Sequence, residues 1–241
     1  MAQVHTLERK RRATTKSDSP AKRKQGLPAA RRRRTSIRLP RETRRAQVLA
    51  EAYKFFSEHG LDAQTRALAA ACGVSQRLLY SLFPNKAALL EAVYRAEIAG
   101  SFKVIWFAEL KDRSVPIEER LTRFYIEYYG TVTTRRWLRL FLYASLADVA
   151  MAPAYIAAVV THMLEIVVAE AAAARQLAMP TDRATTQEIG WILHGSVSHL
   201  AIRRHIYRNE NPLAPEKVIA MQVRCFLSGL PGLLAADAKR T

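Results

Sequence analysis

Apolar positions recur with a helical period along almost the whole chain after residue 40. A first helix is expected from about Arg41 to His59. Its apolar stripe has the i, i+3, i+4 spacing of one helix face and consists of Val48, Leu49, Ala52, Phe55 and Phe56. No segment combines strict alternation of apolar and polar residues with hairpin turns. The pattern therefore predicts an all-α protein.

Two short helices are predicted directly after the first. One begins after Thr65, a good N-cap residue, and stops before Gly73. The other begins after Ser75, a second good N-cap, and runs to about Leu82, where Pro84 follows. Two short helices on either side of a tight, glycine-containing turn are typical of a helix-turn-helix.

Longer helices are predicted for the rest of the chain, separated by proline, glycine and asparagine. Their expected ranges are about 86–111, 116–133, a short one around 137–142, 153–176, 182–207 and 216–236.

The second short helix carries residue types suited to reading DNA. Leu79 and Phe83 lie four apart and are expected in the core, which leaves Gln76, Arg77 and Tyr80 on the outer side. Glutamine can bind adenine and arginine can bind guanine through paired hydrogen bonds in the major groove. Tyr80 and the nearby Lys86 suit phosphate contacts, as do the free N–H groups after Thr65. By itself this segment is equally compatible with a helical hairpin that merely exposes a polar face.

The segment from Arg45 to Leu90 resembles the TetR family of bacterial transcriptional regulators. The matching positions are Phe55-Phe56, Gly60, Thr65, Leu68-Ala69, Gly73-Val74-Ser75, Leu79-Tyr80, Phe83, Lys86 and Leu89-Leu90. The resemblance implies a small helix-turn-helix domain, residues 41–90, and a larger helical domain, residues 91–241, that binds a small molecule and forms a homodimer. Many members have histidine just before the aromatic residue of the third helix, where this chain has Leu82. A DNA contact is therefore in doubt at that position.

The resemblance also indicates which side chains contact DNA. Arg45, which follows the basic N-terminal segment, and Ser75, the predicted helix cap, are added to this set. The expected DNA-binding residues are Arg45, Thr65, Arg66, Ser75, Gln76, Arg77, Leu78, Tyr80, Ser81 and Lys86.

Charge adds an N-terminal arm to this picture. The formal net charge is +17, and residues 1–40 hold 13 Lys and Arg against Glu8 and Asp18, which leaves +6 for the remainder. Because large apolar residues are nearly absent, residues 1–40 are predicted to be a disordered basic arm. Such an arm can track phosphates or enter a minor groove. Alternatively, it is a solvated tail that aids solubility.

Other sequence features favour a cytoplasmic, nucleoid-associated protein without a membrane partner. The two cysteines, Cys72 and Cys225, lie far apart in helical patterns, which suits a reducing compartment. No secretory signal is visible, and the most apolar stretch, residues 155–174, is interrupted by His162, Glu165 and Glu170. No catalytic motif is found, so we expect a non-enzyme without a cofactor or a metal site.

The larger domain gives weaker signals. Candidate ligand-binding residues are Trp106, Tyr128, Trp137, Phe141, His162, Glu165, Trp191 and His194, although core packing is the better explanation for any single aromatic residue. Four polar residues, His162, Glu165, His194 and His199, are expected to point inward. The last two helices, about 183–208 and 216–236, are expected to form the dimer interface, with closure of the monomer core as the alternative.

The expected function is that of a one-component regulator, a repressor that binds a palindromic operator as a dimer and is released by a small molecule. The alternative is an architectural DNA-binding protein driven by the basic arm, which would bind unrelated sequences almost equally.

Overall fold

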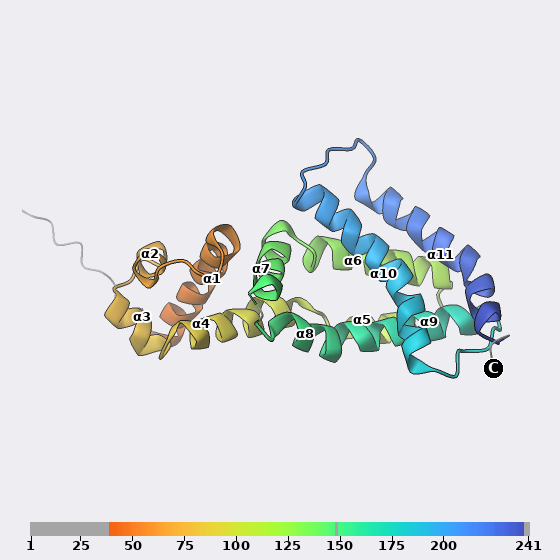
Figure 1. The fold of residues 1–241 in the computed structure, drawn as a ribbon, viewed down its shortest axis with the longest axis horizontal. Coiled ribbons are helices and arrows are strands. Elements are labelled where there is room, and N and C mark those ends of the chain that lie inside the picture. The colour runs from red at the N-terminus through yellow and green to blue at the C-terminus, as the bar shows by residue number, and fades with distance from the viewer. Residues whose placement is uncertain (1–38, 148, 239–241) are drawn as a thin grey trace, which may run out of the picture. The chain divides into compact units, whose positions relative to one another are not determined.

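The computed structural model describes residues 39–147 and 149–238 (Figure 1). Within these residues the regular structure is entirely helical, as the sequence predicts. The predicted arm lies outside the described residues, apart from Leu39 and Pro40.

The first helices form a small packed group. They are α1 (Arg41–His59), α2 (Thr65–Ala71), α3 (Gln76–Leu82) and α4 (Lys86–Val93). Their shared core is fully buried and includes Val48, Ala52, Phe56, Leu68, Leu79, Phe83 and Leu89. One predicted cap is wrong, because α2 begins at Thr65 itself and its N-cap is Gln64, which makes no side-chain capping bond.

The predicted helix over 86–111 is interrupted. After α4 the chain makes a π-helical turn (Tyr94–Ile98) and a short 3-10 turn (Ala99–Ser101), and α5 (Ile105–Lys111) begins separately. The Ser101 hydroxyl donates to the Ile98 carbonyl at 2.8 Å, a local bond that competes with helix continuation. Phe102 then turns inward and packs edge-on against Trp106, with ring centroids 5.1 Å apart.

The larger helical group contains α6 (Ile117–Thr131), α7 (Arg135–Leu146), α8 (Met151–Tyr155), α9 (Thr161–Ala173), α10 (Arg183–His205) and α11 (Pro215–Ala238). A π-helical turn (Ile156–Val160) joins α8 to α9, so the predicted helix over 153–176 is divided there. The helix α10 packs against α9, and α11 packs against α6 and α10. In Figure 1, α10 and α11 lie beside each other and are joined by a long loop.

A buried ion pair fastens α9 to α6. Arg120 donates to the Glu170 carboxylate at 3.1 Å, and Arg113 adds two bonds of 3.0 Å to the same group. Arg120 and Glu170 are both buried. The hydrogen bonds from Arg113 and Arg120 lower the pKa of Glu170, which therefore stays ionised inside the protein.

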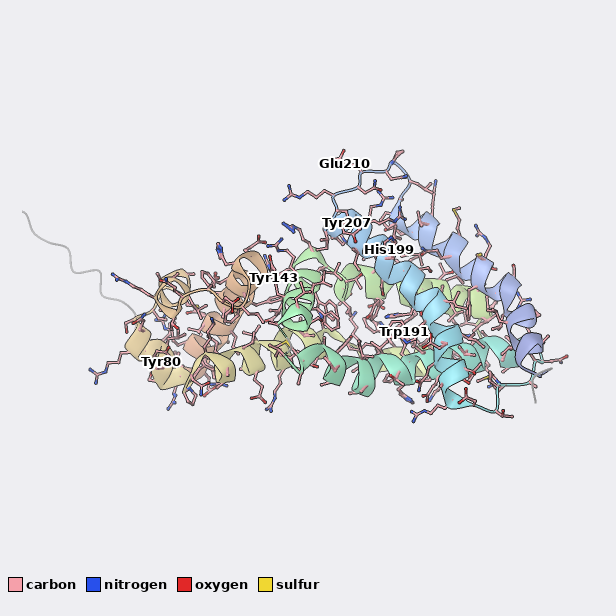
Figure 2. All side chains as sticks on the ribbon, viewed as in Figure 1. Tyr80, Tyr143, Trp191, His199, Tyr207 and Glu210 are labelled. Carbon is pink, nitrogen blue, oxygen red and sulfur yellow. The ribbon has the colours of Figure 1, made fainter. Side chains whose placement is uncertain are left out.

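The helix α7 connects the two groups through an arginine. Arg139 donates to the carbonyl oxygens of Ser57 and Glu58 at the end of α1, the latter at 2.9 Å. It also donates to the Tyr143 hydroxyl at 2.7 Å, and Figure 2 shows Tyr143 on the side of α7 that faces α1. Arg139 thereby satisfies carbonyl groups that the end of a helix leaves open, and α7 holds α1 in place.

Two helical stretches pass a length and hydropathy test for crossing a membrane, Met151–Ala173 and Pro215–Ala235. Half of the first stretch is buried inside the protein, where it packs against α5 and α10. The second packs against α6 and α10. Their apolar character is therefore accounted for, in substantial part, by packing within the helical group.

Candidate DNA-binding interface

The turn between α2 and α3 has the geometry of a helix-turn-helix. Gly73 has a φ of +65°, a left-handed conformation that favours glycine. The Val74 amide donates back to the Ala69 carbonyl at 3.0 Å. The Ser75 side chain then accepts from the Leu78 amide at 3.2 Å, which starts α3 as predicted.

The helix α3 buries one face and exposes the other. Leu79, Leu82 and Phe83 are in the core. The exposed face carries Arg66 from α2 together with Ser75, Gln76, Arg77, Leu78, Tyr80 and Ser81. Within the described part of the chain, the Gln76 and Arg77 side chains make no hydrogen bond, so their polar ends are available to another molecule.

Two of the predicted contact residues also hold the motif together. The Tyr80 hydroxyl donates to the Thr65 hydroxyl at 3.3 Å and thus joins α3 to the start of α2. Figure 2 shows Tyr80 at α3, and 43% of its surface is exposed. Lys86 is half-buried and donates to the Ala63 carbonyl at 2.9 Å, which fixes the loop before α2. Lys86 therefore has a structural role that the sequence did not indicate.

Arginines from the start of α1 cap the end of α3. Arg41 donates to the Ser81 carbonyl at 3.1 Å, and Arg45 donates to the Leu82 carbonyl at 2.9 Å. The Arg45 guanidinium also lies 4.3 Å from the centre of the Phe83 ring, a cation–π contact. The predicted DNA-binding residue Arg45 is thus engaged within the protein and half-buried. The two hydrogen bonds join residues that are 40 and 37 positions apart in the sequence, so no local sequence pattern predicts them.

Leu82 is the position at which the sequence departs from the pattern of the family it resembles. Its side chain is buried in the core between α3 and its neighbours. Leu82 therefore contributes to packing and lies outside the exposed face of α3.

A second group of polar side chains lies inside the larger helical group. We call Tyr125, Tyr128, Tyr155 and His194 the buried tyrosine–histidine cluster; all four are buried. The Tyr128 ring lies 5.3 Å from His194 and 6.4 Å from Tyr125, measured between centroids. Burial lowers the pKa of His194 to about 4 and raises the pKa of each tyrosine. All four side chains are therefore uncharged at neutral pH.

Several predicted ligand-binding aromatic residues surround this cluster. Trp106 is buried and donates to Glu127 at 2.8 Å, and its ring is 6.1 Å from Tyr128. Trp137 stacks on Phe141 at 4.7 Å and meets Tyr155 edge-on at 5.5 Å. Trp191, which Figure 2 shows on α10, is half-buried. The centroid of its ring lies 5.2 Å from that of His194. Sequence reasoning missed Tyr155, which lies in a segment read only as apolar.

The other polar candidates lie apart from the cluster. His162 is exposed and packs edge-on against Phe107 at 4.9 Å. Glu165 is half-buried and accepts from Arg183 at 2.6 Å and Gln187 at 2.8 Å. His199 is also exposed. The expectation that these side chains point inward is therefore wrong for His162 and His199, whereas it is confirmed for His194.

In residues 39–147 and 149–238, no group of three or more His, Cys, Asp or Glu side chains is arranged to hold a metal ion. Two open pockets lie on the larger helical group. One, of about 890 Å³, lies on α6 and reaches Ala220 of α11. The other, of about 570 Å³, lies along α8 and the following π-helical turn.

The helix α3, which follows a capped turn and exposes one polar face, is typical of a helix-turn-helix DNA-binding regulator. Residues 48–93 match the model of the bacterial regulatory proteins of the tetR family. The resemblance to the TetR family is thereby confirmed, with the match confined to this N-terminal segment. No curated protein sequence matches the chain.

Solved structures extend the likeness of fold to the larger helical group. A TetR-like transcriptional regulator from Rhodococcus sp. RHA1 is 22% identical, with a TM-score of 0.61 over 80% of this chain and 100% of that one. A putative transcriptional regulator from Pseudomonas aeruginosa PAO1 is 17% identical, with a TM-score of 0.65 over 81% and 93%. The fatty acid degradation regulator FadR from Bacillus halodurans is 15% identical, with a TM-score of 0.53 over 78% and 94%. At these identities the likeness shows the shared fold.

Proposed function

We propose that this protein is a one-component transcriptional repressor. In this proposal a homodimer binds a palindromic operator through α3, and a small molecule bound in residues 91–241 releases it. The observation that carries the proposal is the exposed face of α3, where Gln76 and Arg77 project without hydrogen-bond partners in the described chain. A helix presented in this way fits the major groove.

The proposed contacts divide by chemistry. Gln76 and Arg77 read base edges, and Leu78, an exposed apolar residue, suits the methyl group of thymine. Contacts to phosphates are assigned to Thr65, Arg66, Ser75, Tyr80, Ser81 and Lys86. Arg45 is assigned an indirect role, because its side chain supports the end of α3.

The test begins with selection of bound sequences from random duplex DNA, followed by titration of the enriched site. We expect Arg77→Ala to weaken binding of that site roughly 5- to 150-fold, because a paired contact to a base contributes about 1–3 kcal/mol. Arg175→Ala is the matched control, since it removes the same charge from an exposed position after α9. Equal effects of the two variants would show that α3 is not the reading helix.

The dimer is proposed to form through α10 and α11. Both helices present exposed apolar side chains, Ile192 with 50% and Met221 with 53% of the surface accessible. The helix α11 also exposes small residues, Ser228, Gly229 and Gly232, that allow close approach of a second copy. A two-fold dimer would place two reading helices on one palindromic site.

A further inference from the structure

Among the described residues, six buried side-chain polar atoms of the larger helical group have no hydrogen-bond partner, and three of these six lie in one cluster. These three are the hydroxyl oxygens of Tyr125 and Tyr155 and the Nδ1 atom of His194. They come from α6, α8 and α10 respectively, and all belong to the buried tyrosine–histidine cluster. Buried polar atoms are nearly always paired, so three unpaired atoms in one cluster are unusual and call for a partner.

Tyr128 links these three side chains into one site. Its ring contacts the rings of Tyr125 and His194. Burial raises the pKa of the Tyr128 hydroxyl, and its interaction with the neighbouring Tyr155 raises this pKa further. A polar group placed in this cluster would therefore find donors and acceptors from three helices.

The surroundings of the cluster are mainly aromatic. Each of the three tryptophans of the chain has its ring within 6.1 Å of a cluster member: Trp106 beside Tyr128, Trp137 beside Tyr155 and Trp191 beside His194. Among the described residues, the buried charged side chains are Arg120 and Glu170, which are paired with each other. An ionised ligand would therefore lack a counter-charge here, and burying it would be costly.

We propose that the buried tyrosine–histidine cluster recognises a neutral aromatic ligand through a hydroxyl group on that ligand. The hydroxyl accepts a hydrogen bond from a tyrosine and donates to the imidazole nitrogen, while the ring packs among the tryptophans. The inference rests on the proposed function, because it names the chemistry of the small molecule that the helical domain senses.

The pocket along α8 supplies the way in. Ala152, Pro153, Ile156 and Thr161 line it, and it has a volume of about 570 Å³. Tyr155 lies in the same stretch of helix, but it is buried and turned toward Trp137. One wall, formed by α8 and its π-helical turn, therefore separates the pocket from the cluster. π-Helical turns are frequent at functional sites, and a shift of this wall would open the cluster to the pocket.

A set of three probes of similar size tests the chemistry: 4-propylphenol, propylbenzene and 4-propylbenzoate. Tryptophan fluorescence of the full chain reports binding, because all three tryptophans border the cluster. We expect saturable quenching by the phenol, binding at least about tenfold weaker by propylbenzene, and none by the carboxylate. Preference for the carboxylate, or equal binding of the phenol and propylbenzene, would overturn the proposal.

Two tyrosine variants separate recognition from packing. Tyr125→Phe removes a buried hydroxyl without a partner, so we expect unchanged or higher thermal stability and roughly 5- to 30-fold weaker phenol binding. Tyr143→Phe, the control, removes a hydroxyl that accepts from Arg139 outside the cluster, so stability should fall and phenol binding should stay unchanged. If Tyr125→Phe lowers stability and leaves phenol binding intact, the hydroxyl is a structural group and the proposal fails.

DNA titration with and without 4-propylphenol distinguishes this inference from the proposed function. Phenol binding that leaves DNA affinity unchanged supports the assigned site and contradicts ligand release of DNA. If 4-propylbenzoate lowers the affinity for DNA and 4-propylphenol does not, the result supports release of DNA by a ligand. The same result overturns the ligand chemistry assigned to the cluster.

Discussion

At the scale of single residues, arginine side chains from distant parts of the chain bind carbonyl groups at the ends of two helices. Arg45 binds a carbonyl at the end of α3, and Arg139 binds two at the end of α1. Each contact joins elements far apart in sequence. The orientation of α3 therefore depends on side chains that lie outside its own exposed face.

Replacing Arg139 should destabilise the protein. We expect Arg139→Met to lower the free energy of unfolding by about 1.5–3 kcal/mol, the usual range for hydrogen bonds made by a charged group, as measured by urea denaturation. Arg136→Met is the control on the same helix, because Arg136 is exposed and makes only a cation–π contact with Tyr53. A cost for Arg139→Met no larger than that of the control would contradict the capping role.

Burial of His194 makes stability depend on pH. Its pKa is about 4 in the folded protein against an ordinary value of 6.5, so the unfolded chain binds a proton first as the pH falls. Neutral, buried His194 therefore makes a stabilising contribution to the free energy of unfolding that is fully present above pH 6.5. This contribution, about 3 kcal/mol in total, is lost as the pH falls toward 4. In His194→Phe we expect the slope of unfolding free energy against pH to be shallower between pH 6.5 and 4. An unchanged slope would show that His194 is not buried in its neutral form.

Residue chemistry was predictable where it depended on local spacing. Leu79 and Phe83 are buried while Gln76, Arg77 and Tyr80 are exposed, as the helical period indicates. His162 was predicted to point inward, but it is exposed. Its helix has apolar residues on more than one side, so the helical period alone does not show which side faces the core. The hydrogen bond from Arg45 to the end of α3 could not be predicted either, because it joins residues that meet only in the folded protein.

At the scale of elements, the end of α4 is the most irregular part of the small helical group. It passes from an α-helix through a π-helical turn to a 3-10 turn before α5. The Trp137 indole of α7 donates to the Ile98 carbonyl within this segment at 3.5 Å, a long hydrogen bond. The same ring contacts Tyr155, so α7 connects the buried tyrosine–histidine cluster to the end of α4.

Removing this indole donor should loosen the end of α4. We expect Trp137→Phe to speed amide hydrogen exchange in residues 94–102, while exchange in α2 and α3 is unchanged. Phe141→Leu on the same helix is the comparison, because it alters packing and removes no hydrogen bond. Unchanged exchange in residues 94–102 would contradict the link between α7 and α4.

The element boundaries that sequence failed to predict have a tertiary cause. Apolar spacing runs on through residues 86–111, so the pattern indicated one helix. The break arises because Ser101 bonds back to Ile98 and Phe102 packs on Trp106. By contrast, the start of α3 was predictable, since the Ser75 cap is a contact over three residues.

At the scale of the whole molecule, the proposed dimer accounts for the exposed apolar surface of α10 and α11. We expect Ile192→Glu to convert a dimer to a monomer in light scattering and to weaken operator binding. Leu146→Glu is the matched control, because Leu146 at the end of α7 is 84% exposed and lies outside these helices. A dimer that survives Ile192→Glu would place the interface elsewhere.

The central claim is that α3 reads a specific DNA sequence while the basic N-terminal segment adds general affinity. The direct measurement is selection of bound sequences with the full chain, with a chain lacking residues 1–38, and with Arg77→Ala. We predict that the full chain enriches a palindrome. The shortened chain should enrich the same palindrome, with binding that is weaker and depends less on salt. Arg77→Ala should lose or alter the sequence preference. Selection of no common sequence by the full chain, with loss of all binding in the shortened chain, would contradict this account and identify an architectural DNA-binding protein.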